Sequence, residues 1–284
     1  MSRAPHIVPA RTVARGRLQR APLVIGGFLV AVVAAAALVS LLWTPYPANA
    51  LDFAAQLQPP SRSHPLGTDA FGRDLASRIL VGARGSLLVG VLSVSIGLGL
   101  GGSIGLVAGW AGGWLDEVLM RIADVLYAFP AILMALLLAA IYQPGIVTAM
   151  VAIGIAMIPL FARIARASAI SVRTAVHVEA GRAIGATPRR LLLRYVLPEA
   201  GSPLVVQTSL SLAVAVLAEA ALSFLGLGSP PDVPSWGSML RDAQGFLAFS
   251  PWPAVVPGLA IVWTVLGWSL LGDGLRDVLD PKTR

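Results

Sequence analysis

The sequence predicts an all-α integral membrane protein with six transmembrane helices. Of its 284 residues, 56% are hydrophobic and only 12% are charged, whereas soluble proteins average about 45–50% and about 25%. Six segments are also long and apolar enough to cross a bilayer, whose hydrocarbon core of about 30 Å needs about 20 residues of helix. The same composition excludes an ordinary soluble domain and an intrinsically disordered chain.

The first apolar segment follows five arginines and precedes an outer loop of about 40 residues. A secretory signal peptide is the alternative interpretation, because Ala48-Asn49-Ala50 resembles a cleavage site. The apolar stretch, at 21 residues, exceeds the about 7–15 residues of a signal peptide, so we expect an uncleaved helix. The six expected spans cover residues 22–42, about 84–109, 118–142 (which contains Pro130), 145–161, 203–225 and 253–271.

The second span carries glycines at a spacing of four residues, Gly97, Gly101, Gly105 and Gly109. This spacing places all four on one helix face, where small residues allow another helix backbone to approach closely. We therefore expect a tight helix–helix contact along this face, and the role of these glycines is structural.

The distribution of basic residues predicts the orientation of the chain. With the N-terminus in the cytoplasm, sixteen of the 21 Lys and Arg residues fall on the inner side, seven of them in the loop 163–199. Because cytoplasmic segments carry an excess of Lys and Arg, we expect both termini to be cytoplasmic. Residues 1–83 then form a tail, the first helix and an outer loop, residues 84–273 a five-helix core, and residues 274–284 a second tail.

The loop 163–199 contains the segment HVEAGRAIGATPRRLLLRYVLPEA, which predicts two short helices on the inner surface. Gly185 and Pro188 separate the two helices, because glycine tolerates a turn and proline suits a helix start. Pro198 is expected to end the second one. A basic amphipathic loop resting on anionic lipid is the alternative. We exclude nucleic-acid binding, because the segment is embedded between two spans.

Several kinds of catalytic site lack the residues that they require. The chain has no cysteine, three widely separated histidines, and one lysine, Lys282, which follows Pro281. Thiolate chemistry, a histidine metal site and the Gly-Lys of a Walker A loop are therefore excluded. We expect no enzyme activity, metal or cofactor in this chain, so any ATP must be hydrolysed by another subunit.

These motifs resemble the binding-protein-dependent ABC importer permeases. Their signature is Glu-Ala-Ala, three residues, Gly, nine residues, Ile, one residue and Leu-Pro, and this chain keeps the spacing with residues 179–181, Gly185 and residues 195–198. Gly181 stands in place of Ala, and Tyr195 in place of Ile. The segments HPLGTDAFGRDLASRILVGARGSL, GGWLDEVLMRIADVLYAFP, EAALSFLGLGSPPDVPSWGSML and LLGDGLRDVLDPKTR are similar to the "C"-type subunit of the dipeptide/oligopeptide (Dpp/Opp) permeases.

The resemblance implies a type I ABC importer transmembrane fold with residues 84–273 as its permease core. It implies a bacterial inner-membrane permease subunit that forms, with a second homologous permease, the translocation path for di- or oligopeptides delivered by an extracytoplasmic binding protein. Two ABC ATPase subunits would hold ATP and Mg. Nickel complexes, glutathione or oligosaccharides are alternative cargoes, and an ion-coupled secondary transporter is a remote alternative. The implied ATPase-coupling residues are Glu179, Ala180, Gly181, Arg182, Gly185, Ala186, Leu197 and Pro198.

Polar residues inside spans indicate functional sites, because their burial in lipid is costly. Gln207 and Glu219 in the fifth span are the candidates for the translocation path, although Glu219 can instead bond backbone N–H groups of the outer loop, which we favour. Asp124 lies one turn from Arg121, so we expect an ion pair between them. The two long outer loops either cap the helices or dock an extracytoplasmic partner.

Overall fold

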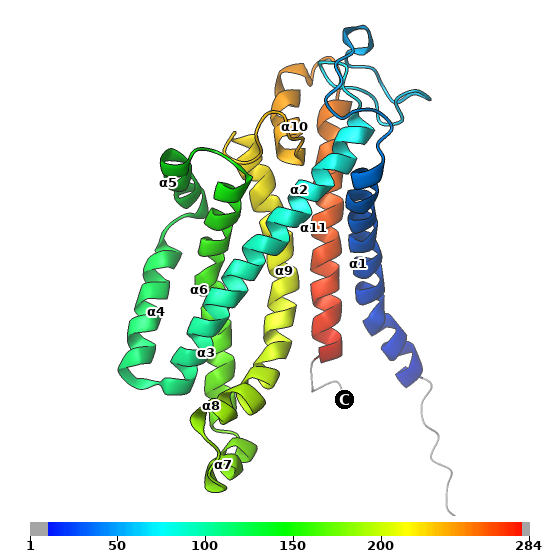
Figure 1. Cartoon of the computed structure of the whole chain (residues 1–284). Helices are drawn as coiled ribbons and strands as arrows, with labels where there is room; N and C mark the ends of the chain where they lie inside the picture. Colours follow the sequence, from blue (N-terminus) through cyan, green and yellow to red (C-terminus); the bar gives the residue numbers. More distant parts are fainter. Residues whose placement is uncertain (1–10, 280–284) are drawn as a thin grey trace, which may run out of the picture.

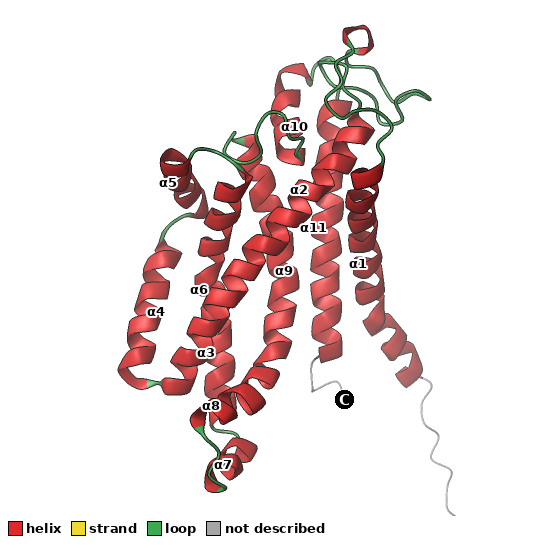
Figure 2. Ribbon diagram, viewed as in Figure 1, coloured by secondary structure: helices red, strands yellow, loops and turns green. Residues whose placement is uncertain are grey.

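The computed structural model describes residues 11–279, and within this range it contains helices and loops but no strand (Figures 1 and 2). Five helical runs are long and apolar enough to cross a membrane, and a bent helix pair forms a sixth candidate, which confirms the all-α fold with six spans. The long runs are α1 (Arg11–Leu42), α2 (Leu75–Ile96) continued by η2 (Gly97–Gly101) and α3 (Gly102–Ala111), α6 (Ile146–Arg173), α8 (Pro188–Leu191) continued by η3 (Leu192–Val196) and α9 (Leu197–Phe224), and α11 (Trp252–Leu279).

The two ends of the bundle differ (Figure 1). One end, the cap end, carries the loop 43–74 and the segment that follows α9. The opposite end, the knob end, carries the projecting segment 174–187, which we call the knob, and both the start of α1 and the end of α11 lie there. The short helices are η1 (Phe53–Ala55), α10 (Trp236–Ala243) and η4 (Gln244–Phe246) at the cap end, and α7 (Val176–Ala183) in the knob.

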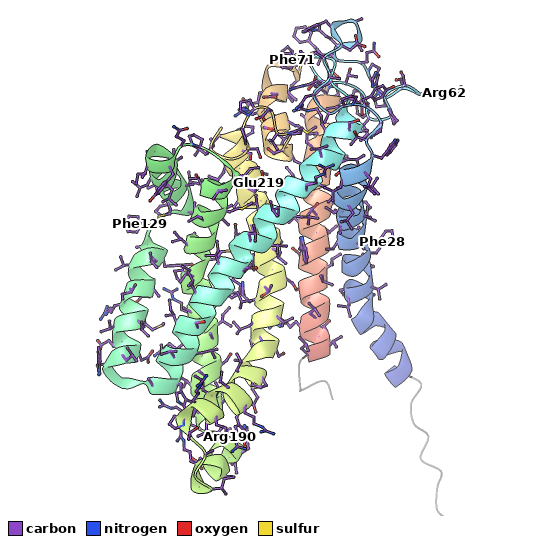
Figure 3. The ribbon with its side chains drawn as sticks, viewed as in Figure 1. Phe28, Arg62, Phe71, Phe129, Arg190 and Glu219 are labelled. Carbon is purple, nitrogen blue, oxygen red and sulfur yellow. The ribbon has the colours of Figure 1, made fainter. Side chains whose placement is uncertain are left out.

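The third expected span is broken, so the prediction of one continuous helix over 118–142 is wrong. α4 (Gly113–Ala128) and α5 (Ala131–Tyr142) meet at a bend of 84°. Phe129, between them, is extended, with φ −82° and ψ 120°. A proline disfavours the helical conformation of the residue before it and has no N–H to continue the helix. Pro130 therefore produces the elbow at Phe129 (Figure 3).

Most other spans are longer than expected, because helices continue where apolar sequence stops. The first begins by residue 11, the second already at residue 75, and the last runs to residue 279. The expected loop 163–199 is therefore shorter in the structure, where only the knob, residues 174–187, lies between the long helices. α6 extends to Arg173 through a segment rich in Ala and Arg, which are strong helix formers. Residues 1–10 and 280–284, the remainder of both expected tails, lie outside the described residues.

Pro198 does not end a helix, contrary to expectation. It lies in the first turn of α9, directly after the π-helical turn η3. The helix therefore runs from the knob through Pro198 into the bundle. A π-helical turn shifts the hydrogen-bond pattern by one residue, and here it stands just before the residue that has no N–H to donate.

The four glycines spaced by four residues lie against α6. A Cβ on Gly97 would come 2.7 Å from Cβ of Met157, and one on Gly109 would come 2.6 Å from the backbone oxygen of Arg166. Real Cβ atoms do not approach so closely, so only glycine permits this spacing between the helices. A second close contact, between α1 and α11, was missed in the sequence: a Cβ on Gly267 would lie 2.9 Å from Cβ of Leu29.

Candidate functional site

The knob is a short helix closed by a glycine turn. α7 ends at Ala183 and is followed by Gly185, whose φ of +82° is the left-handed conformation that glycine adopts without strain. The N–H of Gly185 donates to the carbonyl of Arg182 at 2.9 Å, and that of Ala186 donates to the carbonyl of Gly181 at 3.0 Å. These two bonds form a Schellman motif. The turn leads directly to Pro188 at the start of α8, where Thr187 caps the helix.

The base of the knob is packed tightly onto the bundle. Val178 is fully buried and belongs to a cluster with Ala169, Val172 and Val196. Gly181 is buried too, and a Cβ there would lie 2.8 Å from Cδ2 of Leu191. The glycine that departs from the family signature therefore makes room for α8 to fold back onto α7.

The outer face of the knob is exposed and mixed in character. Val176 and Ile184 are 82% and 83% exposed, and Glu179, Ala180 and Arg182 are exposed beside them. Exposed apolar side chains that are rimmed by charges are typical of a surface that contacts another protein. Leu197 and Pro198 are also exposed, but they belong to α9 rather than to the knob. Arg190, at the start of α8, marks this end of the molecule (Figure 3).

Contacts that the sequence did not reveal fix the knob to α3 and α9. The Arg182 guanidinium of the knob lies 5.2 Å from the centre of the Trp110 ring of α3, and Arg173, the last residue of α6, donates to the carbonyl of Trp110 at 3.2 Å beside it. His177 Nε2 lies 2.9 Å from a carboxylate oxygen of Glu199. These partners are 22 or more positions apart, and no local pattern in the sequence pairs them.

Glu219 of α9, one of the two expected path residues, is 1% exposed, and its side chain faces α2 (Figure 3). Its carboxylate accepts hydrogen bonds from Ser86 at 3.1 Å and from Ser223 at 2.8 Å. The Ser223 hydroxyl in turn accepts from the backbone N–H of Ser229 at 3.2 Å. Glu219 therefore reaches the outer loop through a serine rather than directly, and its contacts join two helices to that loop.

Gln207, the other expected path residue, lines a cavity of about 260 Å³ between the α4–α5 elbow, α6 and α9. Its Nε2 donates to the Ser211 hydroxyl at 3.1 Å. Tyr127 and Ala131 of the elbow contribute to the same wall. The structure therefore separates the two candidates: Gln207 faces open space, whereas Glu219 is enclosed.

The expected ion pair between Arg121 and Asp124 is absent from the described residues. Asp124 instead accepts from Arg163 of α6 at 2.8 Å, and Asp116 accepts two hydrogen bonds from Arg166, at 2.5 and 2.7 Å. Asp116 and Asp124 of α4 point toward α6, so the arginines of α6 lie nearer to them than Arg121 of their own helix.

The outer loops form a cap held by polar contacts. Asp69 accepts from Arg73 at 2.6 Å, and Arg73 also reaches Asp242 of α10 at 3.3 Å. Asn49 donates to the carbonyl of Asp232 at 2.6 Å, which ties the first outer loop to the second. Within residues 11–279 no group of three or more His, Asp or Glu side chains is arranged to hold a metal ion.

Comparison with known proteins places this arrangement among transport proteins. The family described as "Binding-protein-dependent transport system inner membrane component" matches residues 101–284. The chain is 42% identical over 277 residues to the glutathione transport system permease protein GsiD of Pectobacterium atrosepticum, covering 97% of this chain and 92% of the relative. It is 43% identical over 229 residues to the dipeptide transport system permease protein DppC of Alkalihalophilus pseudofirmus, covering 81% and 75%.

A solved structure shares the fold. A chain of the MetNI methionine ABC transporter, determined in inward-facing conformations, superposes with a TM-score of 0.61 at 19% identity and covers 72% of this chain and 96% of its own length. The match at this low identity concerns the architecture of the helices.

Proposed function

The chain belongs to the family of binding-protein-dependent transport system inner membrane components, and on this premise we propose how its parts serve an ATP-driven importer. As a membrane permease, it forms a translocation path together with a second homologous permease subunit. Two ABC ATPase subunits bind ATP and Mg at the knob end, and an extracytoplasmic binding protein delivers cargo at the cap end.

The exposed knob is the observation that carries this proposal. Its base is fixed to the bundle through Val178, while Val176 and Ile184 remain uncovered. A rigid projection with an apolar tip fits a cleft in a partner subunit better than it fits lipid, because its charged residues surround the apolar ones. When ATP closes the ATPase pair, the seated knob moves, and the bundle changes between inward-open and outward-open states.

The knob end is proposed to face the cytoplasm. The start of α1 and the end of α11 lie on this side of the bundle. The knob and the helix ends beside it carry the seven arginines of the segment 163–199, which agrees with the positive-inside rule. The cap end then faces the binding protein. Its polar network presents a fixed outer surface on which such a partner can dock.

Short peptides are the proposed cargo. The names of the two relatives specify dipeptides and glutathione, and glutathione is itself a tripeptide. The common chemistry is a small molecule with an ammonium group, carboxylates and amide bonds. Nickel complexes and oligosaccharides lack this combination, and they are the alternative cargoes that the uptake experiment distinguishes from peptides.

Uptake into proteoliposomes tests the proposal. The chain is reconstituted with its partner permease, both ATPases and the binding protein, and labelled dipeptide, glutathione, nickel complex and oligosaccharide are offered separately. We expect peptide uptake only when ATP is present on the side of the membrane that the knob end faces. Uptake should also require the binding protein on the opposite side. Uptake driven by a proton gradient alone would overturn the assignment and favour a secondary transporter.

A further inference from the structure

A groove of about 410 Å³ lies between α4 and α6 and is lined almost entirely by charged side chains. The two helices run side by side between the elbow and the knob end (Figure 1). The charges are of both signs and equal in number: Asp116, Glu117, Arg121, Asp124, Arg163 and Arg166. We call this feature the charged groove.

The charged groove occupies one face of an amphipathic helix. On α4, Glu117, Arg121 and Asp124 follow each other at steps of four and three residues, which places them on one side. Val118, Ile122 and Val125 each follow one of these residues, so they lie about 100° round the helix on an adjacent face, and they are exposed. Ionised groups facing hydrocarbon are costly, so the apolar face of α4 suits lipid, and its charged face must meet water or protein.

Four of the six charges are already paired. Arg166 bonds Asp116, and Arg163 bonds Asp124. Within residues 21–279, neither Glu117 nor Arg121 has an oppositely charged nitrogen or oxygen within 4.0 Å. The groove therefore presents one negative and one positive group that are free to bind a ligand, one helical turn apart.

The groove adjoins the cavity lined by Gln207. The Arg163 guanidinium, in the groove, lies 4.4 Å from the centre of the Tyr127 ring, and Tyr127 lines the cavity. The cavity, which is lined mostly by apolar side chains with Tyr127, Gln207 and Ser211 as its polar groups, therefore lies next to the charged groove, which continues along α4 toward the knob end.

We propose that the charged groove is a transient binding site for zwitterionic cargo during transport, in which Glu117 binds the ammonium group of a short peptide and Arg121 binds its carboxylate. Residues four apart on a helix have Cβ atoms about 5–6 Å apart, and the ends of an extended dipeptide lie at most about 7 Å apart. The match of length and charge favours a dipeptide-sized cargo. This inference rests on the proposed function and adds to it the residues that contact the substrate.

Thiol labelling tests whether the groove is open to water and to cargo. The chain has no cysteine, so an introduced cysteine is the single thiol of this subunit, and its labelling is read on the band of this subunit after the subunits are separated. Met120→Cys places the reporter in the groove and keeps both free charges, and Ile122→Cys is the matched control on the apolar face of the same helix. We expect a membrane-impermeant, charged methanethiosulfonate to modify Met120→Cys in the full complex at least tenfold faster than Ile122→Cys. Transported dipeptide should slow this modification severalfold.

Transport by charge variants tests the assigned roles. Glu117→Gln and Arg121→Gln are each expected to lower dipeptide uptake about tenfold at subsaturating peptide, because each removes one charge-assisted hydrogen bond. Glu117→Asp and Arg121→Lys keep the charge and should recover most of the loss. A structural role for these exposed groups predicts instead that the neutral and the charge-keeping variants behave alike.

The outcomes separate this inference from the function on which it rests. If the wild-type complex imports dipeptide but Met120→Cys is never modified, the second permease covers the groove and the inference is overturned. Modification that dipeptide does not slow, or normal uptake by both glutamine variants, also overturns it while the importer assignment stands. If the wild-type complex shows no ATP-dependent uptake of any peptide, the proposed function itself fails, and the inference fails with it.

Discussion

Replacing Gly185 by tryptophan should uncouple the permease from its ATPases without preventing its insertion into the membrane. The residue has φ +82°, and L-residues other than asparagine and aspartate pay about 1–2 kcal/mol in this conformation, which is a five- to thirtyfold change in an equilibrium constant. A Cβ at this position has no heavy atom within 4 Å. Alanine therefore adds strain alone, whereas tryptophan adds strain and a large ring on the exposed tip of the knob.

Three variants separate these two effects in the proteoliposome uptake assay, with membrane content measured by immunoblot. Gly185→Asn should import at close to the wild-type rate, because asparagine tolerates the left-handed conformation better than other residues. Gly185→Ala should lose at most about thirtyfold, the upper limit set by the strain. Gly185→Trp should reach the membrane normally but show no ATP-dependent uptake. Wild-type uptake by Gly185→Trp would refute the assignment of the knob as the ATPase contact.

Three further predictions concern the stability of the bundle, measured as the Tm of purified protein in detergent. Gly105→Leu should lower Tm by several degrees, because even a Cβ there would overlap the backbone of α6. Gly99→Leu is the control and should leave Tm unchanged, because nothing lies within 4 Å of a Cβ at that position. Equal Tm values for the two variants would contradict the glycine packing. Glu219→Ala should cost about 1–3 kcal/mol by leaving two buried serine hydroxyls without their acceptor, and Glu219→Gln should cost less; a neutral alanine variant would show that this contact is dispensable. Asp74→Ala should cost about 0.5–2 kcal/mol by removing the N-cap of α2, with hydrogen exchange increased at the first turn; unchanged exchange there would argue against the cap.

The sequence predicted the number of spans and the glycine-lined helix face because both depend on local composition. It misplaced helix ends for a physical reason: apolarity reports where lipid surrounds a helix, whereas hydrogen bonding continues into water. The extension of α6 to Arg173, through a segment rich in Ala and Arg, is the clearest case. The break at Pro130 was visible as a proline, but the 84° angle depends on how α5 packs against α6.

The functional residues divide in the same way. The turn at Gly185 follows from residue type and spacing, and it lies where the sequence placed it. The environment of Glu219 could not be predicted, because Ser86 lies 133 positions away. The same holds for Asp124, whose partner Arg163 comes from another helix. Pattern along the chain predicts which charges share a helix face, but not which helix that face meets.

The packing divides the bundle into a rigid body and a loosely attached helix. The glycine face holds α3 against α6 by backbone contact, and Val178 and Arg182 fix the knob to that pair. α4, in contrast, buries a single side chain, Ala123. It is joined to α3 through Gly112 and Gly113, both with positive φ.

Two ion pairs tie α4 to α6. The Arg163–Asp124 pair is about half exposed, and such pairs contribute only about 0–1 kcal/mol, whereas Arg166 holds Asp116 through two hydrogen bonds. A force on the knob is consequently carried by α3 and α6 together, and α4, which lacks their backbone contact, can change its distance from α6 more easily than α3 can. Since the charged groove lies at the α4–α6 interface, movement of the knob would alter the width of the groove more readily than it would separate α3 from α6.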